Sequence, residues 1–430
     1  MQRVLQFVEF LGEEGWSPEV LTVKQGAYPN RDPALRDRIP ASVPVHRTAT
    51  INPHTIYRIA TGKEETDLPT GGMPDTSRSW METVATWIRA NVFLPDARVG
   101  WWPFAVKRGR ELLRTGRFDA LLTSGAPQSV HLIGWTLQAW TGVPWVADLH
   151  DPWTDISYYD EIPHTTWARR LDEALERGVL SAASAVTTVS PSWKALFAQK
   201  ASNQFFVVEN GIQERQFDGK DVSLSPDQFV LAHVGTLYGG RNPTAVWAAL
   251  AQLREEGALP NLSLRLVGSV DETVRQSLDE YGLMSIVERV EFVPHEEALC
   301  EMARSTLLLL VIEQFAEAEG MITSKLYEYL ASERPVLGIG PPGGDADALL
   351  RAHDAGEIVA WSDASRATAV LRAHYEAWNE GRPIGGADRH ALTAHSRRRQ
   401  ARRMAQVLTY ASGRNPDLSV DRPSFHQKHS

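Results

Sequence analysis

The sequence contains one cysteine, Cys300, in 430 residues. A single thiol cannot form a disulfide within the chain, and no Cys/His spacing typical of a structural zinc site occurs. The composition therefore excludes a disulfide-rich secreted scaffold and favours a reducing, cytoplasmic environment.

Long apolar runs are also lacking. The longest aliphatic run, Leu307–Ile312, is far shorter than the roughly 20 residues that span a bilayer. The first residues carry Glu9, Glu13 and Glu14 and no small-residue cleavage site, so they do not resemble a signal peptide. We expect a cytoplasmic chain without a transmembrane segment.

Basic residues are fewer than acidic ones, because 44 Lys and Arg stand against 53 Asp and Glu, a net charge of −9. Nucleic-acid binders draw most of their affinity from phosphate neutralisation, so the net negative charge argues against nucleic acid as a partner. At 430 residues the chain exceeds the size of one hydrophobic core. At least two domains are therefore expected.

Short apolar runs alternate with segments of helical period along most of the sequence. A helix is predicted at Val4–Leu11, and strands are predicted at Glu19–Val23, Phe118–Thr123, Val143–Asp148, Ala185–Val189, Gln204–Glu209, Phe229–Val234, Ser263–Val267, Val290–Val293, Thr306–Ile312 and Pro335–Ile339. Strands buried on both faces are nearly continuous apolar runs, as several of these are. The pattern predicts an α/β protein with two doubly wound, Rossmann-like parallel sheets.

A polar stretch after Asn210-Gly211-Ile212 has no hydrophobic period and is the predicted hinge. The predicted domains are residues 1–217 and 218–387, followed by an arginine-rich helix at 388–411 and a disordered polar tail at 412–430. The segment 61–79 is interpreted as a mobile loop. An arginine-rich helix most often has a solvated face, and peripheral contact with anionic lipids at the inner face of a membrane is the alternative.

The first candidate site follows the predicted strand at 143–148. Asp148, His150, Asp151 and Asp155 place an imidazole and three carboxylates at one strand end, where parallel sheets bind ligands. Such groups suit acid–base chemistry or hydroxyl recognition. The alternative is that Asp148 and Asp155 only cap the loop and the next helix. No second histidine lies at ligand spacing, which argues against a metal.

The second candidate site is Gly235-Thr236-Leu237-Tyr238-Gly239-Gly240-Arg241, directly after the strand at 229–234. Glycines let the backbone approach an anion, and an arginine fork can chelate phosphate oxygens. The spacing is not that of a P-loop. The alternative is an ordinary glycine turn beside an exposed arginine.

The third candidate site begins the helix after the strand at 306–312. Thr323 or Ser324 can cap this helix, and helical side chains lean towards the amino terminus, which directs Ser324, Lys325 and Glu328 to the strand ends. A carboxylate there can accept hydrogen bonds from two ribose hydroxyls. The alternative is that Glu328 lies on a solvated face.

Several segments together resemble the bacterial glycosyltransferase family 4, the group 1 glycosyltransferases of GT-B fold. In order they are SGAPQSVHLIGWTLQAWTGVPWVADLHDPWTD, VTTVSPSWKALF, VVENGI, HVGTLYGGRNP and SKLYEYLASERPVLGI. The likeness covers most of residues 1–411. It implies two Rossmann-like domains facing across a cleft, with the acceptor on the first, a nucleotide-sugar donor on the second, and a final helix crossing back.

The resemblance also implies roles for individual residues. Glu328 matches the second glutamate of the family's pair, which holds the donor ribose, while Arg241 and Lys325 fall where donor phosphates bind. His150 and Asp151 fall in the acceptor-side loop and are the predicted catalytic residues. Gly235, Thr236 and Ser324 complete the predicted substrate contacts. No metal and no other cofactor is implied, and the donor is a UDP-sugar or a GDP-sugar.

The sequence departs from the family pattern at two places. The first glutamate of the pair is replaced by Gly320, with Glu317 and Glu319 nearby. Family members also begin with a strand and a glycine-rich loop before a segment like QRVLQF, which this sequence lacks. Either the start of the protein lies upstream or the first sheet lacks its central strand.

The sequence thus predicts a retaining glycosyltransferase that moves a sugar to a saccharide or lipid-linked acceptor in surface-polysaccharide synthesis. Two alternatives remain at this point. One is a nucleotide-sugar epimerase of the same fold, and the other is a catalytically silent relative that binds a sugar nucleotide or a partner.

Overall fold

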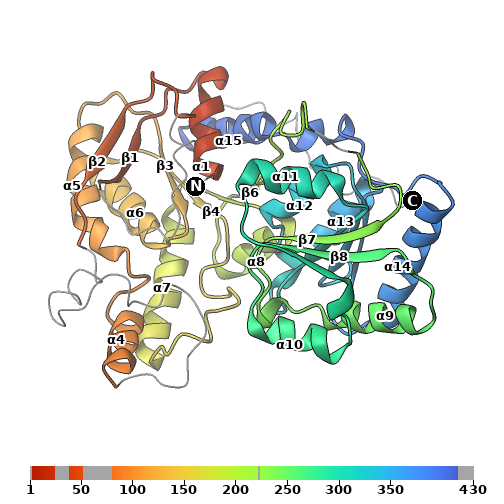
Figure 1. Ribbon diagram of the computed structural model, residues 1–430. Helices are drawn as coiled ribbons and strands as arrows, with labels where there is room; N and C mark the ends of the chain where they lie inside the picture. Colours follow the sequence, from red (N-terminus) through yellow and green to blue (C-terminus); the bar gives the residue numbers. More distant parts are fainter. Residues whose placement is uncertain (1, 25–37, 52–79, 221–222, 415–430) are drawn as a thin grey trace. The chain divides into compact units, whose positions relative to one another are not determined.

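The computed structural model describes residues 2–24, 38–51, 80–220 and 223–414 (Figure 1). Its contacts divide the chain into two compact units. The first comprises Met1–Val189, Trp193–Glu209 and Gln400–Asp421, and the second comprises Ser190–Ser192, Asn210–Arg399 and Arg422–Ser430. Each unit contains parallel β-structure between helices, which confirms the predicted fold class.

The second unit is built on a six-stranded parallel sheet in the order β12-β11-β10-β7-β8-β9. Its strands are β7 (Phe229–Val234), β8 (Leu262–Val267), β9 (Val287–Val290), β10 (Leu307–Val311), β11 (Val336–Ile339) and β12 (Gly356–Val359). The chain starts at β7, runs outward through β8 and β9, and returns to β10 on the other side of β7. The strand order therefore reverses between β7 and β10, the position where doubly wound sheets bind ligands.

Helices cover both faces of this sheet. They are α9 (Thr244–Glu255), α10 (Glu272–Glu280), α11 (His295–Arg304), α12 (Ser324–Ala331), α13 (Asp345–Ala352) and α14 (Ala364–Asn379). Phe229 and Leu231 pack in one core with α9, α10 and α14, while Val230, Ala232 and Val234 pack in the other with α11, α12 and α13. Burial on both faces explains why every residue of β7 except the buried His233 is apolar.

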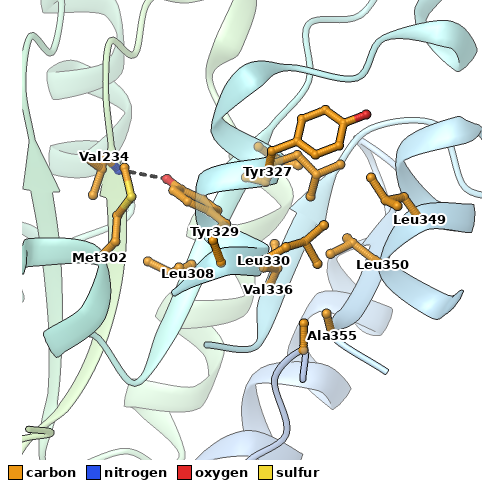
Figure 2. Packing of buried hydrophobic residues seen from close by; sticks show 14 of the residues in the cluster. Val234, Met302, Leu308, Tyr327, Tyr329, Leu330, Val336, Leu349, Leu350 and Ala355 are labelled. Carbon is orange, nitrogen blue, oxygen red and sulfur yellow. Dashed lines mark hydrogen bonds between the residues drawn. The ribbon is translucent and has the colours of Figure 1, made fainter. Parts of the chain in front are cut away.

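Helix α12 is fixed to the end of β7 by a buried tyrosine. The Tyr329 hydroxyl accepts a hydrogen bond from the backbone N–H of Val234 at 3.0 Å (Figure 2). Tyr327 and Leu330 lie in the same apolar cluster. The amino-terminal turn of α12 is thereby held where the strand order reverses.

The first unit contains two separate parallel sheets. Strands β1 (Val20–Val23) and β2 (Val45–Thr48) form one, and β3 (Leu121–Gly125), β4 (Trp145–Leu149), β5 (Ala185–Thr188) and β6 (Phe205–Val207) form the other, in that order. The associated helices are α1 (Gln2–Phe10), α4 (Trp80–Asn91), α5 (Trp102–Leu113), α6 (Ser129–Thr141), α7 (Thr166–Ala182), α8 (Pro191–Lys200) and α15 (Arg397–Ala411). The predicted opening helix is confirmed as α1.

Short 3-10 turns occur in both units, at Leu11–Glu14, Val99–Trp101, Gly239–Arg241, Met284–Ile286, Ala318–Gly320 and Ala391–His395. The last of these precedes α15, so the regular helix within the predicted segment 388–411 begins only at Arg397. From Gln400 onward this helix belongs to the first unit, where Ala401, Met404 and Leu408 pack with α1. The predicted loop 61–79 and residues 415–430 of the predicted tail lie outside the described residues.

An apolar cavity of about 530 Å³ lies between the two sheets of the first unit. Protein interiors are normally packed without voids much larger than a water molecule. Its lining is mostly apolar and comes from α1, β1, α5, β3 and α6.

Three edge strands differ from the sequence prediction. The prediction of a strand at Val290–Val293 was wrong, because β9 spans Val287–Val290 and its exposed Glu288 pairs with Arg265 of β8. Strands β2 and β12 were not predicted. Each of these strands lies at the edge of a sheet and contains charged residues, as edge strands commonly do, so no apolar run marks it.

Candidate functional site

In the second unit, the first candidate residue lies directly after β7. Gly235 has φ +138°, a backbone conformation that side chains rarely adopt, and a β-carbon there would lie 1.7 Å from Lys325 Nζ. Lys325 belongs to the first turn of α12, which Tyr329 anchors to the same strand end. Only glycine at position 235 lets the ammonium group lie against this backbone.

The Lys325 ammonium is held in an environment that disfavours its charge. Burial, and next the nearby Arg241 guanidinium, lower the pKa of Lys325 to about 8, whereas Glu328 acts in the opposite direction. Within the described residues, no hydrogen bond or salt bridge reaches Lys325 Nζ. An anion bound here would therefore stabilise the charged form of the lysine.

Arg241 lies in the short turn Gly239–Arg241 that follows β7. Its guanidinium stacks over the Tyr238 ring at 5.2 Å, and its Nε is 3.9 Å from Glu313 Oε2. The Tyr238 hydroxyl donates to the same carboxylate oxygen at 2.8 Å. Glu313 follows β10, so residues from both strands at the reversal point orient the arginine.

Glu328 lies one turn after Lys325 on α12, with a largely buried carboxylate. Burial raises the pKa of Glu328, although His295, Arg397 and Lys325 each oppose the shift. His295 Nε2 lies 3.8 Å from Glu328 Oε1. The helical spacing thus places a hydrogen-bond acceptor beside Lys325.

The remaining predicted contacts lie at the same strand ends. Thr236 and Ser324 are exposed, and Thr323 is the N-cap residue of α12 without a side-chain capping bond. The Thr323 hydroxyl is buried and has no hydrogen-bond partner among the described residues. These groups leave polar side chains near the positions of Gly235 and Lys325.

Gly320, which replaces the family's first glutamate, is buried at the end of the turn Ala318–Gly320. Glu319 beside it is exposed, and its charge contributes to raising the pKa of Asp345, after the larger effect of burial. The structure therefore offers Glu319 near this position, whereas Gly320 itself supplies only backbone.

In the first unit, Asp148 is the centre of a buried ion pair. Its carboxylate accepts hydrogen bonds from Arg3 at 3.0 and 2.7 Å, from Ser124 at 2.7 Å and from Thr187 at 2.6 Å. Although burial opposes ionisation, the charges of Arg3 and His150 and these bonds hold the pKa of Asp148 well below its usual range. Asp148 is therefore a permanent anion that organises the strand ends.

His150 lies beside this carboxylate. Its Nε2 is 3.1 Å from Asp148 Oδ2 and 2.7 Å from the Ser124 hydroxyl. Because Ser124 donates its only proton to Asp148, it accepts from His150 Nε2–H. In the neutral ring, Nδ1 then carries the lone pair that can accept a proton.

Asp151 lies next to His150 in the chain and is partly buried. Burial raises the pKa of Asp151, while His150 and then Arg3 lower it. A carboxyl group with a raised pKa beside an imidazole is suited to exchange protons with a hydroxyl group. Asp155 instead forms an ion pair with Lys200, away from Asp148.

The structure groups the predicted residues into two sets, each within one unit. His150 joins Asp148 in the first unit, and Gly235, Arg241, Lys325 and Glu328 lie together in the second. The sequence analysis missed Arg3, Thr187, Glu313 and His295. Glu313 directly follows the predicted strand at 306–312, so its position at the carboxyl end of a parallel strand could have marked it as a candidate. No local signal marks Arg3 as the partner of Asp148.

Among the described residues, no group of three or more His, Cys, Asp or Glu side chains is placed to hold a metal ion. No helix in the described part of the chain is both long and apolar enough to cross a bilayer.

Comparison with protein families gives one match. Residues 2–211 match the family described as glycosyl transferase 4-like domain. No curated protein matches the sequence. The family resemblance carried by the motifs is confirmed for this part of the chain.

Comparison with solved structures extends the likeness to nearly the whole chain. The chain is similar to Anabaena HepE in complex with UDP and glucose, with 15% identity, a TM-score of 0.58 and coverage of 95% of each chain. It is also similar to a sucrose-phosphate synthase from Thermosynechococcus elongatus, with 16% identity, a TM-score of 0.56 and coverage of 95% of this chain and 89% of that chain. A glycosyltransferase from Rickettsia africae matches with 12% identity, a TM-score of 0.59 and coverage of 95% and 94%. At these identities the likeness shows the fold.

Proposed function

We propose that the chain transfers a sugar from a nucleoside diphosphate to a saccharide or lipid-linked acceptor, because residues 2–211 match a glycosyl transferase 4-like domain and the chain shares the fold of solved glycosyltransferases. We further propose that the transfer retains the anomeric configuration, needs no metal and serves surface-polysaccharide synthesis. These finer points rest on the family resemblance. The observations below support the donor site most strongly.

The proposal is carried by one observation, the placement of the Lys325 ammonium against Gly235 at the end of β7. Arg241 lies close enough to lower the pKa of Lys325, so two cations converge at the point where the strand order reverses. Converging cations at this position suit the two phosphates of a nucleoside diphosphate. Glu328, one turn further along α12, is proposed to accept hydrogen bonds from the ribose hydroxyls.

The chemistry proposed for this site is stabilisation of a leaving group. The bond between the anomeric carbon and the diphosphate oxygen breaks, and the oxygen keeps the electron pair. An acceptor hydroxyl forms the new bond, and its proton passes to the departing diphosphate. Lys325 and Arg241 neutralise the charge that develops on the diphosphate, which lowers the barrier in place of a metal ion.

The acceptor is proposed to bind in the first unit, near His150 and Asp151. The hydrogen bonds of Ser124 and Asp148 fix the His150 ring and leave Nδ1 as an acceptor for a hydroxyl proton. Asp151 adds a second group that can accept or donate a hydrogen bond. Both residues are proposed to orient the acceptor hydroxyl rather than to form a covalent bond with the sugar.

The donor site is tested by calorimetric titration of UDP, GDP, UDP-glucose and GDP-mannose into the 430-residue chain. HepE was solved with UDP and glucose, which favours the uridine compounds. We expect saturable binding of one nucleotide class, and loss of most of that affinity in Glu328→Ala. Glu255→Ala, an exposed carboxylate in the last turn of α9, is the matched control and is expected to bind like the unaltered chain.

Two outcomes would contradict the proposal. A folded chain that binds none of the four compounds would exclude the donor site. Binding followed by conversion of the donor sugar without any acceptor would indicate an epimerase instead. Product analysis with and without a saccharide acceptor separates these cases.

A further inference from the structure

The loop between β4 and α7 carries the predicted catalytic residues. It comprises residues 150–165, none of which belongs to a helix or a strand. Connections of this length without secondary structure are uncommon in compact domains and usually belong to functional segments. Among the described residues, no backbone–backbone hydrogen bond is made by residues 151–155. The conformation of this part of the loop therefore depends on its side chains.

Asp172 of α7 holds the loop at two points. Its Oδ1 accepts a hydrogen bond from Trp153 Nε1–H at 2.8 Å, and its Oδ2 accepts one from the Tyr159 hydroxyl at 2.9 Å. All three side chains are buried. Each oxygen of the carboxylate thus has its own donor, and the two donors come from different parts of the loop.

Glu176, one turn further along α7, holds the next loop residue. Its Oε2 accepts hydrogen bonds from the Thr154 hydroxyl at 2.6 Å and from Lys200 Nζ of α8 at 2.7 Å. Lys200 also forms an ion pair with Asp155. Residues four apart lie on the same face of a helix. One face of α7 therefore presents two buried carboxylates, Asp172 and Glu176, to consecutive residues of the loop.

Buried carboxylates are a costly way to hold a loop. A buried charge is unfavourable unless it is well paired, and apolar side chains of similar volume often pack as well. Burial raises the pKa of Asp172 to about 6, although the hydrogen bonds from Trp153 and Tyr159 oppose the shift. Hydrogen bonds supply what apolar packing lacks, because they fix the direction of both donor side chains.

These bonds act close to the predicted catalytic residues. The backbone N–H of His150 donates to the Gly125 carbonyl at 3.2 Å, and its ring contacts Ser124. Trp153 is fixed by α7. Asp151 lies between these two attachments, so the position of its carboxyl group depends on both of them.

We propose that Asp172 and Glu176 are positioning residues of the acceptor site. Through their hydrogen bonds to the loop, they hold His150 and Asp151 where the acceptor hydroxyl binds. These roles rest on the acceptor site proposed above. Neither buried carboxylate contacts the acceptor itself.

The proposal is tested with two substitutions of one residue. Asp172→Ala leaves Trp153 and Tyr159 without their acceptor. In Asp172→Asn the amide oxygen can still accept from Trp153, and the amide nitrogen can donate to the Tyr159 oxygen. The matched control is Glu173→Ala, because Glu173 is the next residue of the same helix, is partly exposed and lies 3.9 Å from Arg177.

NMR provides two readouts that belong to the loop. The first is hydrogen exchange of the Trp153 indole N–H, and the second is the tautomer of the His150 ring, assigned with Trp153→Phe and His150→Gln. We expect exchange to be at least tenfold faster in Asp172→Ala, and the Nε2–H tautomer of His150 to give way to a mixture. Asp172→Asn and Glu173→Ala should match the unaltered chain.

Backbone amides of β5 distinguish positioning from general stability. They lie in the same unit and pair with β4 and β6, so their exchange should not change in Asp172→Ala. Two results would overturn the proposal. One is a His150 ring signal that stays unchanged in Asp172→Ala, and the other is a loosening of β5 equal to that of the loop.

A pH profile of the unaltered chain gives a second test, which needs no destabilised variant. The pKa of Asp172 is about 6 in the fold and returns towards 3.8 when the loop opens, so protonation favours the held loop. Opening should become roughly tenfold rarer from pH 7 to pH 5, and this effect is lost as the pH rises through about 6. Exchange of the Trp153 indole, corrected for its intrinsic pH dependence, measures it.

Asp172→Asn should abolish this pH dependence. Besides Tyr159, the charged or titratable groups around the cluster are Asp96, His164, Arg169, Glu173, Glu176 and Lys200. All of them remain in Asp172→Asn. A pH dependence that survives in this variant would belong to one of them and would overturn the role of Asp172.

Titration of UDP into the same variants separates this proposal from the proposed function. UDP affinity should be equal in the unaltered chain, Asp172→Ala and Glu173→Ala, because the proposed donor residues lie in the second unit. A chain that binds no UDP in any form would contradict the donor site, while the loop readouts would still decide the role of Asp172. A fall in UDP affinity in Asp172→Ala alone would indicate a general effect on the fold and would count against positioning.

Discussion

In the first unit, the carboxylate of Asp148 accepts hydrogen bonds from Arg3, Ser124 and Thr187. In the second unit, no described residue accepts a hydrogen bond from the ammonium group of Lys325 or forms a salt bridge with it, and burial lowers its pKa. One buried charge is therefore satisfied by the protein itself, whereas the other has no partner among the described residues. The charge in the first unit maintains structure, and the charge in the second unit is the one that we propose binds the donor.

The largest expected effect is on stability and concerns the buried ion pair of Asp148. Asp148→Ala leaves Arg3 buried without its partner, so we expect the free energy of unfolding to fall by about 3–5 kcal/mol. Urea unfolding at pH 7 measures the loss. Because the pKa of Asp148 lies below the ordinary value of 3.8, its contribution is present above that pH and is lost only as the pH falls through the lowered pKa.

The control for this variant is Asp119→Ala, which breaks an exposed ion pair with Arg414 in the same unit. Surface pairs contribute at most about 1 kcal/mol, so this change should be small. Equal losses in the two variants would show that the Asp148 pair has no special structural role.

The next largest effect is expected on the affinity for the donor. Arg241→Ala is expected to weaken the affinity for the donor by about 1.5–3 kcal/mol, the range for a hydrogen bond to a charged group. Its free energy of unfolding should change little, because removal of a partly buried cation relieves repulsion with Lys325. Calorimetric titration measures the affinity, with Arg372→Ala as an exposed control on α14. Unchanged affinity would remove Arg241 from the site.

A smaller effect is expected from Gly235→Ala. The added β-carbon would collide with Lys325 Nζ and would require an unfavourable φ of +138°, so stability should fall by about 1–3 kcal/mol. Donor affinity should fall as well, because the ammonium group must move. Urea unfolding of Gly235→Ala in a Lys325→Ala background isolates the collision, since only the backbone strain remains there. If the substitution costs the same in both backgrounds, Lys325 does not lie against Gly235.

The smallest effect is a dependence on pH. The pKa of Lys325 is about 8, so its cationic fraction falls as the pH rises above that value. Donor affinity should therefore weaken by roughly tenfold between pH 7.5 and 9.5, a range in which arginine stays charged. Titrations of the unaltered chain and of Lys325→Arg check this, and the variant should show a flatter profile. Parallel profiles would assign the pH dependence to another group.

For the free energy of unfolding, the pKa of Lys325 predicts a pH dependence of the opposite sign. Its folded pKa lies below its unfolded value of 10.5, so the charged form is disfavoured in the fold. The cost is fully present below about pH 8 and disappears as the pH rises towards the unfolded pKa. As the pH rises above about 8, donor affinity should therefore weaken, while the cost of burying the Lys325 charge should disappear from the free energy of unfolding.

The strands that were predicted well are the central ones. Phe229–Val234 is β7 without any shift, because both faces of this strand are buried and every residue is apolar or nearly so. The prediction at Val290–Val293 was wrong because β9 is an edge strand, which among the described strands pairs with β8 alone. The Glu288 side chain of β9 forms a salt bridge with Arg265, and Phe292, which lies after the end of β9, is exposed. Apolar content alone does not locate an edge strand.

The candidate residues also divide into those that the local sequence marks and those that only the fold brings together. His150, Arg241 and Lys325 were found because each lies just after a predicted strand or in the first turn of the following helix, and that rule needs only local sequence. Their roles remain predictions. The residues that surround them, such as Arg3 beside Asp148 and Glu313 beside Arg241, lie more than seventy positions from their partners. Only folding brings these pairs together.

The sequence by itself determined the alternation of apolar runs and helical segments, and with it the parallel sheets and the strand ends where polar residues collect. Those features depend on neighbouring residues and on the period of each element. The tertiary structure decided which charges have protein partners, that Lys325 has none among the described residues, and that β1 and β3 line one apolar cavity. These properties depend on distances between segments far apart in the chain, because burial and hydrogen bonding are set by what packs against each group.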